Sequence, residues 1–200
     1  MARDTLTSRI LRWLLLVALA GVALQLFFIG RIALMAVVDP SSTTFERSEA
    51  WRIVTEKGAL RWRQQWVPYA QISDHLKRAV IASEDGDFIN HDGVEWEAIE
   101  KAWQKNTQAE ELAAKRAAKT PPGKPAPAAK APKIVGGSTI TQQLAKNLLL
   151  SGERTLLRKG QEFVLTMALE LLLSKQRILE IYLNHVEWGE GVFGAEAAAQ

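Results

Sequence analysis

The stretch FVLTMALELLL, residues 163–173, decides the fold class of this 200-residue chain. Its apolar residues surround the helix axis and are interrupted only by Thr166 and Glu170, a pattern typical of a helix buried on all sides. The stretch is too short, and too polar at its start, to be a membrane crossing. It therefore predicts a central buried helix over residues 158–173.

Helical signals continue on both sides of this stretch. Residues 139–150 and 175–184 are predicted as helices, and Ser151 and Gly152 separate the first of them from the central helix. Further upstream, apolar residues at positions 72, 76, 79 and 80 define one face of another helix beginning near Gln71. No stretch shows the alternation of a strand, so the sequence predicts a mainly α domain.

Size and composition limit the possible classes of protein. With 48% hydrophobic residues, 200 residues suffice for one core of ordinary size plus an anchor. The net charge of +3, from 25 basic and 22 acidic residues, favours anionic surfaces and phosphates without requiring nucleic acid. Cysteine is absent, which excludes disulfides and thiolate metal sites.

The amino-terminal part is apolar enough to cross a bilayer. Residues 13–30 carry no charge, and residues 32–38 continue the apolar character beyond Arg31. Arg3, Arg9 and Arg12 precede the run, which by the positive-inside tendency places the start of the chain in the cytoplasm. We predict residues 1–40 as a cytoplasmic start and a single uncleaved transmembrane helix.

Two other interpretations of this run remain open. A cleaved signal peptide would have a shorter apolar region ending in small residues, whereas residues 27–30 (Phe-Phe-Ile-Gly) form a poor cleavage site. A buried core helix is the second alternative, although such helices rarely stay apolar on every face over this length.

The rest of the chain divides at changes of composition. Residues 41–70 are polar with interspersed aromatics and are predicted as a juxtamembrane segment. Residues 71–200 form the predicted domain. Within it, residues 107–133 are first rich in Ala, Glu and Lys and then hold five of the seven prolines. Such a tract cannot pack a core, so we predict an inserted flexible loop, with a function for it left open.

The first polar cluster, residues 84–93, directly follows the upstream helix and reads Glu-Asp-Gly-Asp-Phe-Ile-Asn-His-Asp-Gly. Glu84 lies four residues beyond Val80, so we expect it to face protein rather than water. Partial desolvation would raise its proton affinity and suit it to general acid or base catalysis. A calcium loop is excluded because Asn90 stands where that loop needs glycine. A structural role for the cluster, and for His91 within it, remains open.

The second cluster, residues 136–147, reads Gly-Gly-Ser-Thr-Ile-Thr-Gln-Gln-Leu-Ala-Lys-Asn. Its two glycines and following hydroxyls place backbone N–H groups at a helix start, where an anion is favoured. Gln142, Gln143 and Lys146 can share or adjoin one helical face, which offers sugar hydrogen bonds beside a phosphate-binding charge. A polar helix start without a ligand is the alternative.

The third cluster places three cations, Arg154, Arg158 and Lys159, shortly before the carboxylate of Glu162. A local ion pair is the simple explanation, since Glu162 lies three and four residues from Lys159 and Arg158. In a reaction that expels pyrophosphate, the same cations would stabilise the charge on the leaving group, with or without a divalent metal. Both interpretations can hold together.

These clusters, in this order, resemble the peptidoglycan glycosyltransferases of family 51, particularly the monofunctional biosynthetic transglycosylases of Gram-negative bacteria. The resemblance covers most of the chain from Trp66 onward. It rests on residues 82–85 with Phe88 and residues 91–93, on residues 136–147, on Arg158, Lys159 and Glu162 leading to residues 178–184, and on residues 188–189 and 194–196.

The resemblance implies a lysozyme-like α-helical glycosyltransferase domain that binds lipid II and the lipid-linked growing strand in neighbouring sites. Glu84 would deprotonate the acceptor 4-hydroxyl, which attacks the anomeric carbon of the donor and expels undecaprenyl pyrophosphate. Glu162 would be the second catalytic carboxylate, assisting the pyrophosphate site. The implied substrate-binding residues are Ser138, Thr139, Gln142, Gln143, Lys146, Asn147, Arg154, Arg158 and Lys159, and the residues that support the motif are Asp85, Phe88, His91 and Gly93.

The resemblance also implies magnesium or manganese, held near Glu84 or Glu162, and no organic cofactor. It implies a bacterial inner-membrane protein with its catalytic domain in the periplasm, and proteins of cell-wall synthesis as candidate partners. The chain departs from the family in its 107–133 insertion and in ending at Gln200, where members continue for several more helices. No Ser-x-x-Lys motif occurs, so transpeptidase activity is not expected.

Two other functions remain as alternatives. A lysozyme-like lytic enzyme would cut the same polymer with a catalytic carboxylate, but it has no use for a cationic pyrophosphate site such as Lys146 and the cations of residues 154–159. A non-catalytic scaffold of cell-wall synthesis is the alternative from a different class. It leaves the presence of both Glu84 and Glu162 unexplained.

Overall fold

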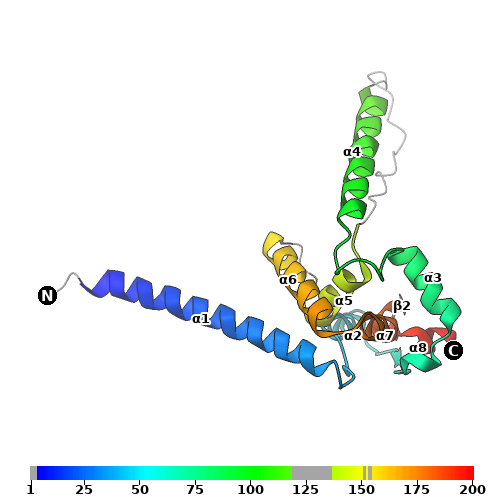
Figure 1. Ribbon diagram of the computed structural model, residues 1–200, viewed down its shortest axis with the longest axis horizontal. Coiled ribbons are helices and arrows are strands. Elements are labelled where there is room, and N and C mark those ends of the chain that lie inside the picture. The colour runs from blue at the N-terminus through cyan, green and yellow to red at the C-terminus, as the bar shows by residue number, and fades with distance from the viewer. Residues whose placement is uncertain (1–3, 119–136, 151, 153–154) are drawn as a thin grey trace.

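The computed structural model describes residues 4–118, 137–150, 152 and 155–200, and it confirms the mainly α prediction. One long helix, α1 (Asp4–Leu34), projects from a domain of shorter helices (Figure 1). The helices of the domain are α2 (Thr44–Lys57), α3 (Asp74–Glu84), α4 (Trp96–Ala118), α5 (Ile140–Leu149), α6 (Leu156–Leu172), α7 (Lys175–His185) and α8 (Ala195–Ala199). Between them lie the short 3-10 helix η1 (Tyr69–Gln71) and the strands β1 (Arg63–Gln64), β2 (Glu187–Gly189) and β3 (Val192–Phe193).

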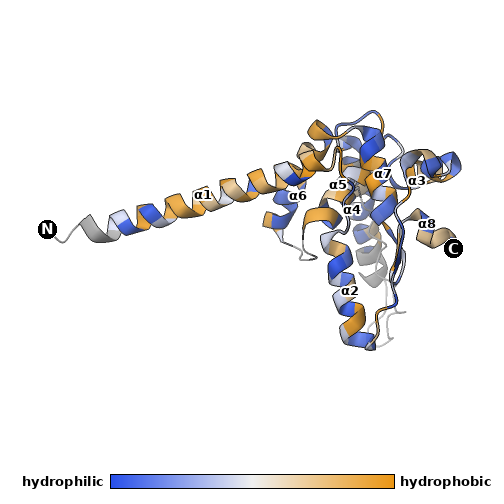
Figure 2. Cartoon of the chain, turned by 90° about the horizontal axis from the view of Figure 1, so that it is seen from below, coloured by the Kyte–Doolittle hydropathy of each residue, from blue (hydrophilic) through white to orange (hydrophobic). Residues whose placement is uncertain are grey.

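Helix α1 has the length and composition of a membrane span. Its apolar part, Thr7–Leu34, has 28 residues and at about 1.5 Å per residue extends about 42 Å, beyond the ~30 Å of a hydrocarbon core. Figure 2 shows α1 coloured mainly as hydrophobic. None of its most apolar 18-residue window is buried, which contradicts the alternative of a buried core helix. The finding fits the predicted anchor.

The last turns of α1 are attached to the domain. Ile32 and Met35 are buried against it, at 0% and 4% exposure. Gln25 and Gln161 of α6 exchange two amide hydrogen bonds of 2.6 and 3.0 Å. Nε of Arg177, in α7, donates to the backbone oxygen of Met35 at 2.7 Å. The direction of the anchor is therefore set by packing against α6 and α7.

Helices α5, α6 and α7 supply most of the core, including Leu144, Leu148, Leu165, Leu169 and Ile178, all at most 1% exposed. The prediction that α6 is buried on all sides is wrong. Phe163, Val164 and Leu171 are 41%, 47% and 84% exposed, because the core covers one face of α6 and the described helices leave the face with these side chains open.

The structure adds two features to these expectations and corrects a third. Residues 44–57 of the predicted juxtamembrane segment form α2, which begins with a capping box between Thr43 and Glu46. Helix α4 continues to Ala118, so the predicted loop from residue 107 is helical over its first part, and residues 119–133 lie outside the described residues. Strands are also present, in a small sheet of order β1-β3-β2 whose two- and three-residue strands are too short to show alternation.

Buried polar contacts fix the segment after α1 to α7. The His185 ring lies between two oxygens, with Nδ1 2.7 Å from Oε1 of Glu46 and Nε2 3.1 Å from the backbone oxygen of Pro40. Gln64 donates to the same oxygen of Glu46 at 2.8 Å. Both Glu46 and His185 are at most 2% exposed. The link between anchor and domain is therefore part of the folded core.

Candidate functional site

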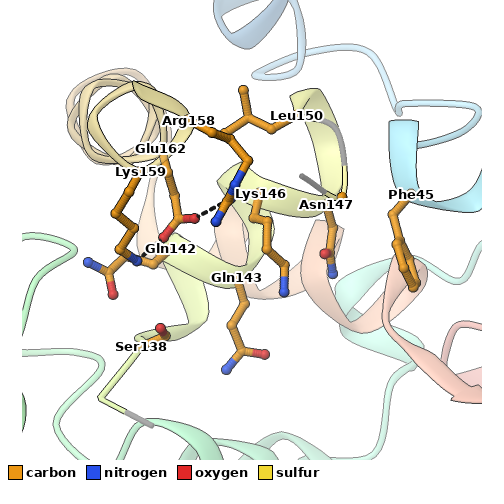
Figure 3. A pocket seen from close by; sticks show the side chains of 11 residues that line it. Phe45, Ser138, Gln142, Gln143, Lys146, Asn147, Leu150, Arg158, Lys159 and Glu162 are labelled. Carbon is orange, nitrogen blue, oxygen red and sulfur yellow. Dashed lines mark hydrogen bonds and ion pairs between the residues drawn. The ribbon is translucent and has the colours of Figure 1, made fainter. Parts of the chain in front are cut away.

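A cavity of about 380 Å³ lies where α5 faces the first turns of α6 (Figure 3). It brings together eight residues that the sequence analysis assigned to catalysis or substrate binding, although they come from two separate clusters of the sequence. These are Ser138, Gln142, Gln143, Lys146, Asn147, Arg158, Lys159 and Glu162. Arg154 lies outside the described residues.

The start of α5 is fixed by a capping box. Thr139 Oγ1 accepts from the backbone N–H of Gln142 at 3.1 Å, and Gln142 Oε1 accepts from the backbone N–H of Thr139 at 3.1 Å. The Thr139 hydroxyl also donates to the backbone oxygen of Gly93 at 2.6 Å. Thr139 is buried and does not line the cavity, so its contacts shape the helix start. Ser138, one residue earlier, does line it.

Positive charge exceeds negative charge in the cavity lining. Glu162 is 3% exposed, its Oε2 accepts from Nη1 of Arg158 at 2.8 Å, and its Oε1 contacts Nζ of Lys159. Lys146, on α5, adds a third cation and is exposed. The predicted local ion pair is therefore present, and it neutralises only part of the positive charge. An anion with several oxygens matches this surplus.

Arg158 has a guanidinium nitrogen without a hydrogen-bond acceptor among the described residues. Nε of Arg158 is buried and makes no hydrogen bond within the described part of the chain. Leaving such a group without a partner costs about 1–3 kcal/mol. Because this nitrogen has no exposed surface, it reflects the cost of burying the Arg158 guanidinium group and does not identify a ligand.

Glu84 is exposed, and the expectation that it faces the protein interior is wrong. The reason is geometric: Glu84 is the last residue of α3, and the buried side of the helix continues from Val80 to Asp85, which is 4% exposed. The buried carboxylates at this site are those of Asp85 and Glu162. An exposed Glu84 remains open to an incoming substrate.

Gln143 connects Glu84 to the cavity. Its Nε2 donates to Oε2 of Glu84 at 3.0 Å, and its Oε1 accepts from the hydroxyl of Tyr182 at 3.1 Å. Burial, together with the nearby negative charge of Glu84, raises the pKa of Tyr182 to about 12. Figure 3 shows Gln143 and Lys146 leaving α5 on the same side. Glu84 thus lies one side chain away from the cation-lined cavity.

The four residues predicted to support the motif join the end of α3 to the start of α5. Asp85 Oδ1 lies 2.8 Å from Nε2 of His91, and Asp85 Oδ2 accepts from the backbone N–H of Ile140 at 2.9 Å. The His91 Nδ1 accepts from the backbone N–H of Gly93 at 3.0 Å, and Phe88 is fully buried beside the His91 ring. These contacts hold Glu84 beside Gln143.

The residues that the structure describes do not form a metal site by themselves. Among the described residues, no group of three or more His, Cys, Asp or Glu side chains could hold a metal ion. Both oxygens of Glu162 contact cations. Magnesium often takes only one or two protein carboxylates and completes its shell with substrate phosphates and water. The expected magnesium or manganese therefore stays a prediction.

Two contributors to the site were missed in the sequence. Phe45 of α2 lines the cavity and packs edge-on against Phe193, but it lies in a segment predicted as a juxtamembrane link. Tyr182 lies inside a block quoted for the resemblance, yet nothing in the sequence indicates that its hydroxyl fixes Gln143. Both contacts depend on tertiary packing between distant segments.

The model of the protein family described as "Transglycosylase" matches residues 52–115 and 127–200, which together are more than half of the chain. The chain belongs to the transglycosylase family. The resemblance seen in the sequence is therefore confirmed. The matched residues include α5, α6 and Glu84, so this transglycosylase-family domain contains the cavity described above.

Curated relatives carry the name "Biosynthetic peptidoglycan transglycosylase". The relative from Burkholderia thailandensis is 50% identical over 181 residues, covering 90% of this chain and 62% of the relative. That from Cupriavidus metallidurans is 50% identical over 198 residues, covering 95% and 75%. That from Cupriavidus pinatubonensis is 52% identical over 198 residues, covering 95% and 69%. The chain thus spans 62–75% of the length of these relatives.

Proposed function

We propose that the chain is a peptidoglycan glycosyltransferase that transfers the lipid-linked growing strand to the 4-hydroxyl of lipid II and releases undecaprenyl pyrophosphate. The observation that carries the proposal is the cavity with Lys146, Arg158 and Lys159, beside the exposed carboxylate of Glu84. Membership of the transglycosylase family and the names of the relatives support it.

Glu84 is the proposed general base. It takes the proton of the acceptor 4-hydroxyl, and the oxygen forms a bond to the anomeric carbon of the donor sugar. The bond between that carbon and the pyrophosphate oxygen breaks, and the pyrophosphate leaves with the bonding electrons. Arg158, Lys159 and Lys146 line the cavity, which supports their proposed role of stabilising the negative charge of the leaving group. Gln143 keeps Glu84 at the edge of the cavity.

Glu162 has a different proposed role from Glu84. It is buried, and both its oxygens contact cations, so it is not available to an acceptor hydroxyl. We assign it to the pyrophosphate site, where it holds Arg158 and Lys159 in place before the substrate arrives. Glu162 therefore acts on the reaction through those two cations.

We propose that magnesium or manganese reaches the site with the pyrophosphate of the substrate. This follows from the lack of a preformed group of ligands in the described residues. Isothermal titration of magnesium into the free protein is expected to give no specific binding, whereas magnesium added to a chelated polymerisation reaction is expected to increase the rate. Tight magnesium binding without substrate would contradict this assignment.

The proposed location is the bacterial inner membrane, crossed once by α1, with the domain in the periplasm. The exposed apolar helix and the arginines Arg9 and Arg12 at its start support this orientation. Because the chain has no cysteine, single cysteines can be introduced and labelled. A membrane-impermeant maleimide is expected to label Ser73→Cys in spheroplasts and Thr7→Cys only after lysis. The opposite pattern contradicts the orientation.

One experiment separates polymerisation from the alternatives. The purified full chain in detergent is incubated with labelled lipid II and, separately, with preformed glycan strands. Growth of strands from lipid II, without shortening of preformed strands, is the expected result. Shortened strands without growth would favour a lytic enzyme. Lipid II binding with neither growth nor shortening would favour a scaffold.

A further inference from the structure

A second cavity, of about 250 Å³, lies where the chain leaves α1 and turns towards α2. Its lining combines two kinds of surface. Leu34 and Val38 are apolar and about half exposed, at 56% and 49%. Arg31 from the last turn of α1 and Arg47 from α2 bring two guanidinium groups to the same cavity. Nothing in the proposed reaction uses this cavity.

The charge of the two guanidinium groups is the second feature of this cavity. Within the described residues neither Arg31 nor Arg47 forms an ion pair. Arg47 instead donates from Nη1 to the hydroxyl of Ser42 at 2.9 Å and from Nη2 to the hydroxyl of Thr44 at 3.1 Å. The carboxylate in the lining, that of Asp39, pairs with Arg177 at 2.7 Å. The cavity therefore keeps a positive charge. The guanidinium group of Arg47 is oriented by these two hydroxyls, whereas that of Arg31 lies over the Phe27 ring, with Cζ 5.9 Å from the ring centroid.

The cavity also lies at the depth of lipid headgroups if α1 crosses the membrane. Arg31 lies in the last turn of the long apolar helix, and Val37 and Val38 beyond the helix are still exposed apolar side chains. An arginine bordered by apolar residues on both sides is expected at the boundary between acyl chains and headgroups. Met35, buried against the domain, keeps this part of the chain in place. The cavity is thus preformed.

We propose that this cavity binds the headgroup of an anionic glycerophospholipid, with the phosphate between Arg31 and Arg47 and an acyl chain along Leu34 and Val38. Each guanidinium group presents several N–H donors in a geometry that matches phosphate oxygens. The exposed apolar side chains of Leu34 and Val38 favour a lipid over a soluble anion. The inference rests on the proposed membrane crossing of α1 and does not depend on the glycosyl transfer.

The test measures lipid binding to the purified full chain in detergent by native mass spectrometry, with dioctanoyl phosphatidylglycerol as the probe. The variant Arg31→Gln/Arg47→Gln is compared with Arg9→Gln/Arg12→Gln, which removes two exposed cations from the opposite end of α1. Each arginine near a membrane surface contributes roughly a fivefold change in affinity. We expect weakening by more than about tenfold in the first variant and little change in the second.

Equal weakening in both double variants, or none in either, overturns the proposal because it indicates diffuse electrostatic attraction. Glycerol 3-phosphate in solution distinguishes the source of the phosphate. Competition at the same concentration as the lipid would show a site for free phosphate esters and overturn the lipid assignment. Dioctanoyl phosphatidylcholine, which has no net charge, is expected to bind more weakly than the anionic probe.

A second variant guards against loss of folding. Ser41→Trp adds a large side chain to the lining without changing the charge, and Ser41 is exposed. It is expected to weaken phosphatidylglycerol binding as strongly as the loss of both arginines, while the circular dichroism spectrum stays that of the parent. Unchanged binding in a folded Ser41→Trp protein overturns the assignment. Because lipid II is absent from this assay, the result is independent of the polymerisation measurements.

Discussion

Replacing Glu162 by glutamine removes a negative charge that contacts two cations. Glu162 is 3% exposed, and its oxygens contact Arg158 at 2.8 Å and Lys159. Breaking a fully buried ion pair by removing one partner costs about 3–5 kcal/mol. The side chains of Arg158 and Lys159 are 17% and 53% exposed, so water compensates for part of the lost contact. We therefore expect a loss of about 2 kcal/mol in the free energy of unfolding.

Thermal unfolding of the full chain in detergent, followed by near-ultraviolet circular dichroism, measures this loss. For a chain of this size 1 kcal/mol corresponds to about 2–4 °C, so Tm is expected to fall by about 4–8 °C. Glu97→Gln is the matched control, because Glu97 pairs with Lys101 at 3.2 Å with both side chains largely exposed. That pair contributes at most about 0.5 kcal/mol, and the control should melt within about 2 °C of the parent.

The same variant tests the anion site. Glu162→Gln leaves the positive charges of Arg158 and Lys159 in the cavity, so pyrophosphate is still expected to bind the variant and to raise its Tm. Pyrophosphate at a hundred times its Kd raises the free energy of unfolding by about 2.7 kcal/mol, which is enough to offset the loss expected from Glu162→Gln. The reasoning would be refuted if the Glu162→Gln protein had the same Tm as the parent, or if its Tm did not change on addition of pyrophosphate.

Two other predictions concern the residues that hold the site together. In a Tyr69→Phe variant Tyr182 is the single tyrosine, and absorbance at the phenolate band should show its titration near pH 12, with a lower midpoint after Glu84→Gln. Because folding raises the pKa of Tyr182, the contribution of its neutral hydroxyl to stability is complete below about pH 10 and is lost as pH rises towards 12. A titration midpoint that Glu84→Gln leaves unchanged would contradict the electrostatic effect of Glu84 on Tyr182. Gly93→Ala should lower the free energy of unfolding by at least about 2 kcal/mol, because φ is +81° and a Cβ would lie 2.7 Å from a methyl carbon of α6. Denaturant unfolding should show a much smaller effect for Gly86→Ala, where the added Cβ has no neighbour within 4 Å; similar losses in both variants would refute the packing argument.

The helices around the cavity were predictable because their signals are local. Thr139, Thr155 and Ser174 each accept a hydrogen bond from a backbone N–H in the first turn of α5, α6 or α7. The observed helices accordingly begin and end within two residues of the predicted ranges. The pairing of Glu162 with Arg158 was predictable for the same reason, since spacing of four residues places both side chains on one helix face.

The burial of individual side chains and the contacts between distant helices were not predictable, because they depend on tertiary packing. Helix spacing placed Glu84 in line with Val80, but the end of α3 turns Asp85 inwards, where it meets the N–H of Ile140 fifty-five residues later. The contact of Tyr182 with Gln143 is likewise set by the packing of α7 on α5. Local spacing carries no information about which of two neighbouring carboxylates the remainder of the chain will cover.

The initial rate of strand polymerisation from lipid II by Glu84→Gln, with Glu97→Gln as control, tests the central claim most directly. A positioned general base increases the reaction rate by about 100- to 10,000-fold. The kcat of Glu84→Gln should therefore fall by at least about 100-fold, while its affinity for lipid II stays near that of the parent. Glu97→Gln, exposed on α4, should polymerise at the parental rate. A Glu84→Gln protein that polymerises within a few-fold of the parent would contradict the account.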